Sequence, residues 1–316
     1  MHKDTGFLLV ALLIPVAAFL ATRTIGNEYL FFAGYVVLQF VVLATGWNVM
    51  GGYAGYVNFG AGAFFAVGAY AAAAVSKAFG WPLPVQILAA TLAAGLLGLA
   101  VGVLTLRLRG VFFSIATVAI AVVIETAVLN WAYMGGARGM TAVQPDTPAG
   151  FATYMRWLFV VMAVLAVLAV AAARSVERSR LGRGLRALRD DEMAAESAGV
   201  PTLRLKVMAS TLSGALMGMA GAPYALYLGF IEPTSVFSLN YAVSALAMPV
   251  IGGTASWLGP VIGAVLLASA QQTVSVTVSS ELNVLIVGVL LIVFVVAAPQ
   301  GILGLLRNVR KRGNNP

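Results

Sequence analysis

Long apolar runs separated by short polar stretches dominate the sequence. A membrane-spanning helix needs about 20 mostly apolar residues, and ten runs approach that length. They cover residues 7–22, 29–50, 57–76, 83–106, 110–131, 155–173, 203–228, 239–252, 257–278 and 282–298. The pattern predicts an all-α fold, in which residues 1–316 form a single polytopic transmembrane helical bundle of about ten spans, some of them broken or re-entrant.

Two of these runs have alternative interpretations. The eighth is short and ends at Gly252-Gly253, which favours a half-helix or a re-entrant segment. The first follows Lys3 and ends in small residues, so it is either a cleaved signal peptide or a retained helix. We favour the retained helix.

Two polar segments interrupt the apolar pattern. Residues 133–154 contain several glycines and prolines and are typical of a loop. Residues 174–206 hold the longest stretch of charge in the chain. Between Gly184 and Ala198, leucines and alanines alternate with charged residues, which predicts one amphipathic helix outside the bilayer that ends at Gly199.

Positive charge falls mainly on one side of this pattern. Most of the 19 Lys and Arg residues lie in 174–206, at 107–109 and at 307–312. Because loops rich in Lys and Arg face the cytoplasm, we expect 174–206 and both termini inside and 133–154 outside. The chain is therefore expected to be a multi-pass protein of a bacterial inner (plasma) membrane.

The composition supports a lipid environment and excludes several functions. Hydrophobic residues make up 61% of the chain and charged residues only 9%, against about 25% charged in soluble domains. The net charge of +8 does not indicate nucleic-acid binding, because the basic residues stand at the ends of apolar runs. With no cysteine and His2 as the single histidine, we expect no catalytic residue and no metal site, which disfavours a membrane enzyme.

The charged segment contains candidates for contact with another protein. Ala194 and Ala195 would permit close approach, and Arg189 and Glu192 could form charged contacts. Alternatively, 174–206 is an ordinary solvated loop whose charges only orient the chain. Composition alone leaves both interpretations open.

A glycine-rich stretch, Gly51–Gly62, separates two apolar runs. It has no lysine, so we do not interpret it as a phosphate-binding loop. It predicts either close helix packing or an interrupted helix whose backbone lines a translocation pathway, and Gly252-Gly253 offers a similar break. The candidate pathway residues at the two breaks are Tyr53, Tyr56, Asn58, Phe59, Gly252 and Gly253.

Glu125 lies within the fifth run. Carboxylates at membrane depth usually face the bundle interior or a water-filled cavity, so Glu125 is a further candidate for the pathway. The alternative, which we favour slightly, is a structural hydrogen bond or simple proximity to the outer interface.

Several motifs together resemble the permeases of branched-chain amino acid ABC importers of the LivM type. They are Gly52-Tyr-Ala-Gly55 with Ala63-Phe-Phe-Ala-Val-Gly-Ala-Tyr70, Arg107-Leu-Arg-Gly110, Gly135-Gly136, Gly182–Gly199 and Ile251-Gly-Gly253 with Leu258-Gly-Pro260. In this family the Gly182–Gly199 stretch corresponds to the loop that contacts the ATPase subunit. The resemblance assigns ATPase coupling to Gly184, Arg186, Ala187, Arg189, Asp191, Glu192, Ala194, Ala195 and Gly199.

The resemblance implies the other components of the transporter. They are a second, related permease that forms a heterodimer with this chain, two cytoplasmic ATPase subunits and a periplasmic substrate-binding protein. The chain has no G-x-x-x-x-G-K-[ST] motif. We therefore expect ATP and Mg²⁺ on the partner subunits and no cofactor on this chain.

Some positions depart from the family pattern, among them Tyr56, Asn58 and Arg138. These positions lie near the expected pathway, so the substrate is a branched-chain or related amino acid or, alternatively, urea or a short-chain amide. A stand-alone secondary transporter or channel is a further alternative. The scarcity of charge within the apolar runs disfavours it.

Overall fold

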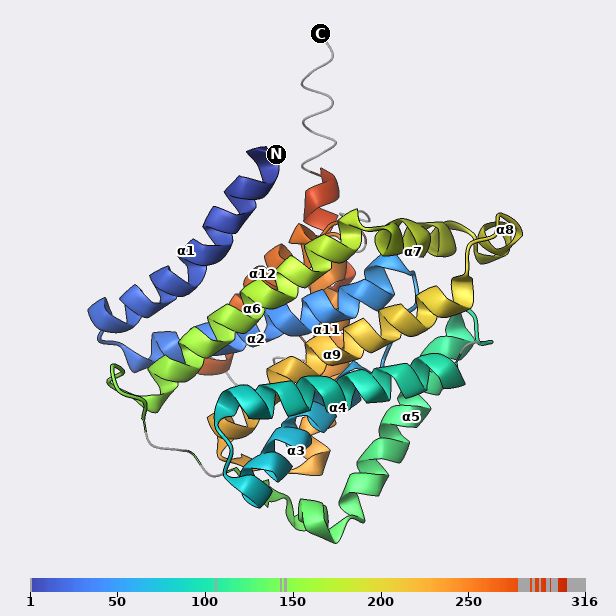
Figure 1. Cartoon of the computed structure of the whole chain (residues 1–316). Coiled ribbons are helices and arrows are strands. Elements are labelled where there is room, and N and C mark those ends of the chain that lie inside the picture. The colour runs from blue at the N-terminus through green and yellow to red at the C-terminus, as the bar shows by residue number, and fades with distance from the viewer. Residues whose placement is uncertain are drawn as a thin grey trace.

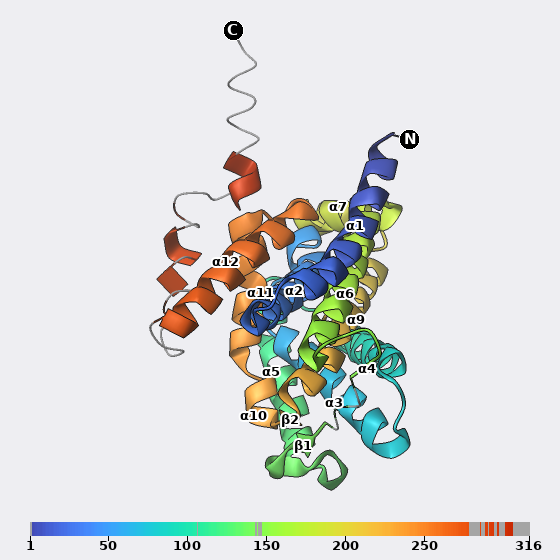
Figure 2. The ribbon, with the colours of Figure 1, turned by 90° about the vertical axis from the view of Figure 1, so that its left-hand side faces the viewer.

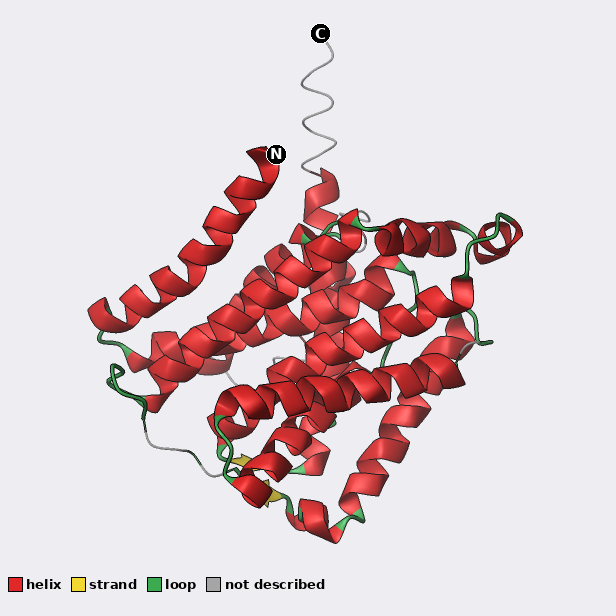
Figure 3. Cartoon of the chain, viewed as in Figure 1, coloured by secondary structure: helices red, strands yellow, loops and turns green. Residues whose placement is uncertain are grey.

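The computed structural model describes most of the chain. The described residues are 2–105, 107–142, 144, 147–277, 285, 288–289, 291–293, 296 and 301–305. The tenth expected span, 282–298, lies largely outside them, and the basic cluster 307–312 lies wholly outside them. The described part is almost entirely helical (Figure 3), which confirms the predicted all-α fold.

The helices follow the apolar runs closely. Two short strands pair antiparallel, with Met140 opposite Ile231. In chain order the elements are α1 His2–Thr24, α2 Glu28–Asn48, η1 Val49–Tyr53, α3 Ala61–Phe79, α4 Leu83–Leu104, α5 Val111–Leu129, η2 Ala132–Met134, η3 Gly136–Arg138, β1 Met140–Thr141, α6 Tyr154–Arg178, α7 Arg180–Asp190, α8 Glu192–Ser197, α9 Thr202–Leu228, β2 Phe230–Ile231, α10 Pro233–Val236, α11 Leu239–Gly252 and α12 Leu258–Thr277.

Among the described residues, seven helical segments are long and apolar enough to cross a membrane. They are α2 with η1, α3, α4, α5, α6, α10 with α11, and α12. The expected count of ten is therefore not confirmed. In α1 the apolar part is shorter, Leu9–Thr24. The longest helix, α9, is not among the seven, because serine, threonine and glycine occupy many of its positions.

Small residues allow α9 to pack in the centre of the bundle, against α2, α3 and α4 (Figure 1). A Cβ atom at Gly68 of α3 would overlap the carbonyl oxygen of Gly218. On α4, the carbonyl of Gly98 accepts a hydrogen bond from the Ser210 hydroxyl at 2.7 Å. Helix backbones that approach this closely gain dispersion contacts, which drive helix association in lipid.

The helix α5 is the least buried of the seven candidate spans. Only 17% of its apolar window is buried, and it diverges from α4 in Figure 1. Val111 and Phe112 are each 72% exposed, and Ile115 is 60% exposed. This apolar face needs lipid or another protein chain to cover it.

The two polar segments lie at opposite ends of the bundle. Figure 2 shows α7 and the N-terminus at one end, with β1, β2 and α10 at the other. This arrangement fits the prediction that 133–154 and 174–206 face opposite sides of a membrane.

Candidate functional site

Two short helices, α7 and α8, form the surface at one end of the bundle, and we call them the docking helices. The Ser179 hydroxyl begins α7 by accepting a hydrogen bond from the Gly182 N–H at 3.2 Å. Leu185 and Leu188 lie on one face and are buried, while Arg183, Arg186 and Arg189 are exposed. The amphipathic pattern predicted from the sequence is thus present.

The prediction of one helix over 184–198 was wrong, because the chain breaks at Asp191. The Asp191 carboxylate accepts the N–H groups of Met193 at 2.9 Å and Ala194 at 3.0 Å, so it caps a new helix instead of continuing the old one. The predicted end at Gly199 is confirmed, since this residue has a φ of +81° after α8.

The outward face of the docking helices carries both apolar and charged side chains. Met193 is 68% exposed, and Ala194 beside it is exposed as well. Of the other predicted coupling residues, Arg186, Arg189, Asp191 and Gly199 are exposed, Gly184, Ala187 and Glu192 are half-buried, and Ala195 is buried.

Glu192 is the centre of an ionic network beneath α8. Its Oε1 lies 2.5 Å from Nζ of Lys206 and 3.3 Å from Nε of Arg109, and its Oε2 accepts the hydroxyl of Tyr56. Burial alone would raise the pKa of the Glu192 carboxyl. The hydrogen bonds from Lys206 and Tyr56, together with the charges of Lys206 and Arg109, outweigh burial and hold this pKa below its usual value.

Exposure separates the two cations of this network and predicts different effects for their removal. The Lys206 side chain is 3% exposed, whereas that of Arg109 is 49% exposed. We expect Lys206→Gln to lower the free energy of unfolding by about 2 kcal/mol and Arg109→Gln to lower it by less than about 1 kcal/mol. Thermal unfolding of the detergent-solubilised variants measures both. Equal losses would contradict the burial argument.

The helix break between α2 and α3, residues 49–60, which we call the first break, lies directly under the docking helices. After Asn48 the chain widens into the π-helical turn η1 and then runs without helix to Gly60. Arg189 Nη1 donates to the Gly52 carbonyl at 2.8 Å. Gly55 has a φ of +77°, and a Cβ atom there would lie 2.9 Å from Cγ of Arg189. The end of α7 therefore rests on this break.

Arg189 and Glu192 thus have partners within the chain. From the sequence we expected both side chains to meet another protein. In the structure both side chains also hold the docking helices to the first break. Their contact with another protein stays a prediction. Tyr53 and Tyr56 likewise direct their hydroxyls to carboxylates, those of Glu177 and Glu192.

The second break, Gly253–Trp257, lies between α11 and α12 and touches the first. Asn48 Nδ2 donates to the Thr254 carbonyl at 3.2 Å. The helices α11 and α12 approach closely because Gly252 has no side chain. A Cβ atom there would overlap the Gly259 carbonyl oxygen. The two glycine-containing breaks, far apart in the sequence, are therefore in direct contact.

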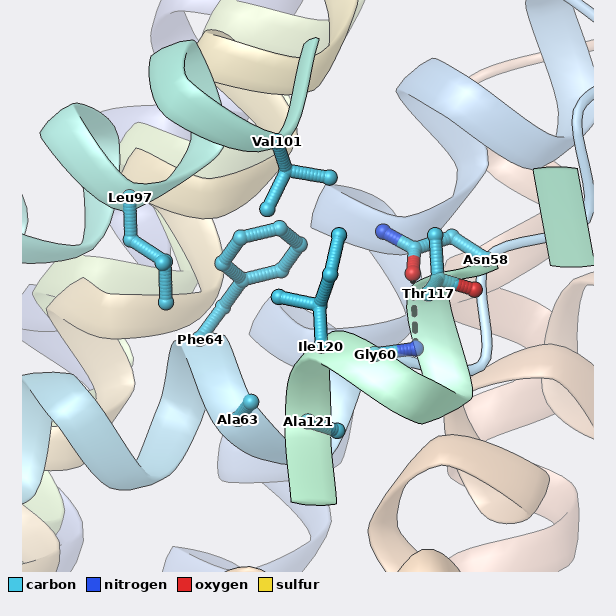
Figure 4. A pocket seen from close by; sticks show the side chains of 9 residues that line it. All are labelled: Asn58, Gly60, Ala63, Phe64, Leu97, Val101, Thr117, Ile120 and Ala121. Carbon is cyan, nitrogen blue, oxygen red and sulfur yellow. Dashed lines mark hydrogen bonds between the residues drawn. The ribbon is translucent and has the colours of Figure 1, made fainter. Parts of the chain in front are cut away.

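A small pocket lies beside the first break, between α3, α4 and α5 (Figure 4). The Asn58 carboxamide is fully buried, and its Oδ1 accepts the Gly60 N–H at 2.7 Å. Nδ2 consequently faces the apolar side of the pocket, where it has no hydrogen-bond partner among the described residues. Phe59 and α5 are joined here, since the Phe59 N–H donates to the Thr117 hydroxyl at 3.2 Å.

Glu125 lies apart from these residues. It is half-buried on α5, about 12 Å along the helix from Thr117, and in the described part of the chain no hydrogen bond or ion pair involves it. Its assignment to a pathway therefore stays a prediction.

Sequence reasoning missed Lys206 and Arg109 as site residues. Arg109 belongs to the Arg107-Leu-Arg-Gly110 motif of the family resemblance, but the sequence assigns neither residue a contact beyond orienting the chain. One signal could have indicated Lys206, which stands between apolar residues at the start of a long helix. Its pairing with Glu192 comes from tertiary structure. Among the described residues no group of three or more His, Cys, Asp or Glu side chains could hold a metal ion.

Comparisons with known proteins identify relatives over most of the chain. Residues 29–295 match a family described as "Branched-chain amino acid transport system / permease component". The chain is 30% identical to the high-affinity branched-chain amino acid transport system permease protein LivM of Escherichia coli strain K12, over 88% of this chain and 71% of that protein. The LivM protein of Salmonella typhimurium is 29% identical, over 96% of this chain and 76% of that protein.

A second, shorter similarity joins the chain to a different permease. This chain is 30% identical to the permease protein LivH of Escherichia coli strain K12, over 41% of each chain. No solved structure matches the chain significantly.

Proposed function

The chain belongs to the family of permease components of branched-chain amino acid transport systems, and from this premise we propose that it is a transmembrane subunit of an ATP-driven ABC importer. The docking helices would lie on the cytoplasmic side of a bacterial inner membrane and receive movement from separate ATPase subunits. The observation that carries this proposal is the hydrogen bond from the Tyr56 hydroxyl to Glu192, which links α8 to the break between α2 and α3.

The geometry supports transmission of movement in three steps. The face of α8 around Met193 is open to a partner. Glu192 and Arg189 tie the docking helices to the first break. This break is in turn hydrogen-bonded to α5, since Ser114 Oγ donates to the Val57 carbonyl at 2.8 Å. Displacement of α8 would therefore shift the first break and the inner part of α5 together.

The proposal includes the partner components. The similarity to both LivM and LivH fits a heterodimer with a second, related permease, and the exposed apolar face of α5 would be covered by that permease or by lipid. ATP and Mg²⁺ would bind to two ATPase subunits, and a periplasmic binding protein would deliver the substrate. By family, the substrate would be a branched-chain or related amino acid.

Uptake by cells that lack only this subunit tests the proposal. We expect labelled leucine, isoleucine and valine to accumulate when the chain is supplied on a plasmid, and uptake to fall to background without it. Uptake of urea or a short-chain amide, with no uptake of leucine, would contradict the proposed substrate. Purification of the active chain from its native membrane without any ATPase subunit would contradict the ATP-driven mechanism.

A further inference from the structure

Glu177, near the end of α6, connects two parts of the bundle that are distant in sequence. Its Oε2 accepts the Tyr53 hydroxyl at 3.3 Å and the Trp257 backbone N–H at 2.7 Å. Tyr53 is the last residue of η1, and Trp257 directly precedes α12. A single carboxylate oxygen therefore bridges the first break and the second break.

The surroundings of this oxygen give the bridge a defined geometry. Trp257 N–H is one of the amide groups at the start of a helix that have no intrahelical partner, and the positive end of the helix dipole favours a carboxylate there. A Cβ atom at Gly52, in the first break, would lie 2.8 Å from the Thr254 carbonyl oxygen in the second break, so the two backbones touch. Replacement of either break by a longer loop would remove this fit.

The docking helices reach the same place from the other side. Arg189 holds the Gly52 carbonyl, and Arg186 Nη2 donates to the backbone carbonyl of Glu177 at 3.2 Å. The turn η1 is thus enclosed between the end of α7 and the second break. Movement of α7 would be passed to η1 and, through Glu177, to the start of α12.

We infer that Glu177 is a positioning residue for transport, which makes η1 and the start of α12 move as one unit when the docking helices move. The inference rests on the proposed function. According to this inference, movement of the docking helices also reaches α12, through η1 and Glu177. The property required of residue 177 is an oxygen that accepts two hydrogen bonds, and the negative charge adds only the favourable interaction with the helix dipole.

Variants at position 177 distinguish these two properties. The assembled transporter, reconstituted in liposomes, is measured for uptake and ATP hydrolysis. We expect Glu177→Ala to reduce the ratio of uptake to ATP hydrolysed at least tenfold while hydrolysis continues. Glu177→Gln, whose amide oxygen can occupy the position of Oε2, should keep this ratio within about twofold of the unsubstituted protein. Glu232→Ala, which removes an exposed acidic group between β2 and α10, away from the docking helices, is the matched control and should leave the ratio unchanged.

A second measurement does not depend on transport. The chain has no cysteine, so Thr254→Cys introduces a single reporter thiol into the second break. We expect maleimide to label this thiol several times faster when Glu177→Ala is added and at an unchanged rate when Glu177→Gln is added. Tyr53→Phe, which removes one of the two hydrogen bonds, should give an intermediate rate and serves if Glu177→Ala does not assemble.

Three results would overturn the inference. One is an unchanged coupling ratio and labelling rate in Glu177→Ala. Another is loss of coupling in Glu177→Gln as severe as in Glu177→Ala, which would assign the role to charge. The third is faster labelling in Glu232→Ala, which would show that the release of the second break is unspecific. Because the labelling does not depend on the substrate, failure of the proposed function would be recognised separately, as absent uptake by the unsubstituted protein.

Discussion

Substitution of Glu192 by lysine is expected to abolish uptake while the chain remains in the membrane. The new ammonium group would stand beside Lys206, whose side chain is 3% exposed, and beside Arg109. Removal of one partner from a buried ion pair costs about 3–5 kcal/mol, and here a like charge replaces the partner. The docking helix α8 would therefore leave the first break, because Tyr56 loses its acceptor as well. Labelled amino acid uptake should fall at least about 100-fold, since about 1.4 kcal/mol corresponds to a factor of ten.

Two further variants separate this effect from general damage. Glu192→Gln keeps an acceptor for Tyr56 and loses only the charge, so we expect partial uptake. Glu232→Lys makes the same change of charge at an exposed site between β2 and α10, away from the docking helices, and it should retain uptake within a few-fold of the unsubstituted protein. Immunoblots of membrane fractions measure how much of each variant is inserted. Normal uptake by Glu192→Lys would contradict the role of α8 in coupling.

The helices could be predicted from the sequence because length and hydropathy determine them locally. The expected run 239–252 coincides with α11, and 257–278 differs from α12 by one residue at each end. In lipid every backbone polar group must be satisfied within the helix, so a long apolar run has few alternatives. The number of spans was less certain, because α9 has the length of a span and the polarity of a helix buried in protein.

The candidate site could be located from the sequence but not assembled. The charged segment and the glycine-rich break were both recognised. Their connection through Tyr56 and Glu192 spans 136 positions in the chain, and no local pattern indicates that Glu192 turns inward. Lys206 and Arg183 are both basic residues of the same polar segment, yet the first is buried and the second exposed. The break at Asp191 was missed because its capping side chain competes with a helix that the amphipathic pattern would continue.

The folded bundle should be most sensitive to side chains added where α3 meets α9. We expect Gly68→Ala to prevent accumulation of folded protein, because the new Cβ would overlap the carbonyl oxygen and Cα of Gly218. Both obstructing atoms belong to the backbone, so no side chain can turn aside and one helix must shift. Overpacking of a close-packed core costs about 1–3 kcal/mol and occasionally more, and a displaced α9 would also disturb its contacts with α2 and α4. The yield of monodisperse protein in detergent and its unfolding temperature measure the effect.

Gly95→Ala is the matched control, because it adds the same methyl group to another helix that faces α9. Its nearest neighbour would be the Cβ of Ala215 at 3.4 Å, an ordinary van der Waals contact. Alanine is favoured over glycine inside a helix by about 1 kcal/mol, so this variant should unfold at the same temperature as the unsubstituted protein or slightly above it. Stable, monodisperse Gly68→Ala protein would show that α3 and α9 can separate at this point. In that case the close approach of their backbones would not be what holds α9 at the centre of the bundle.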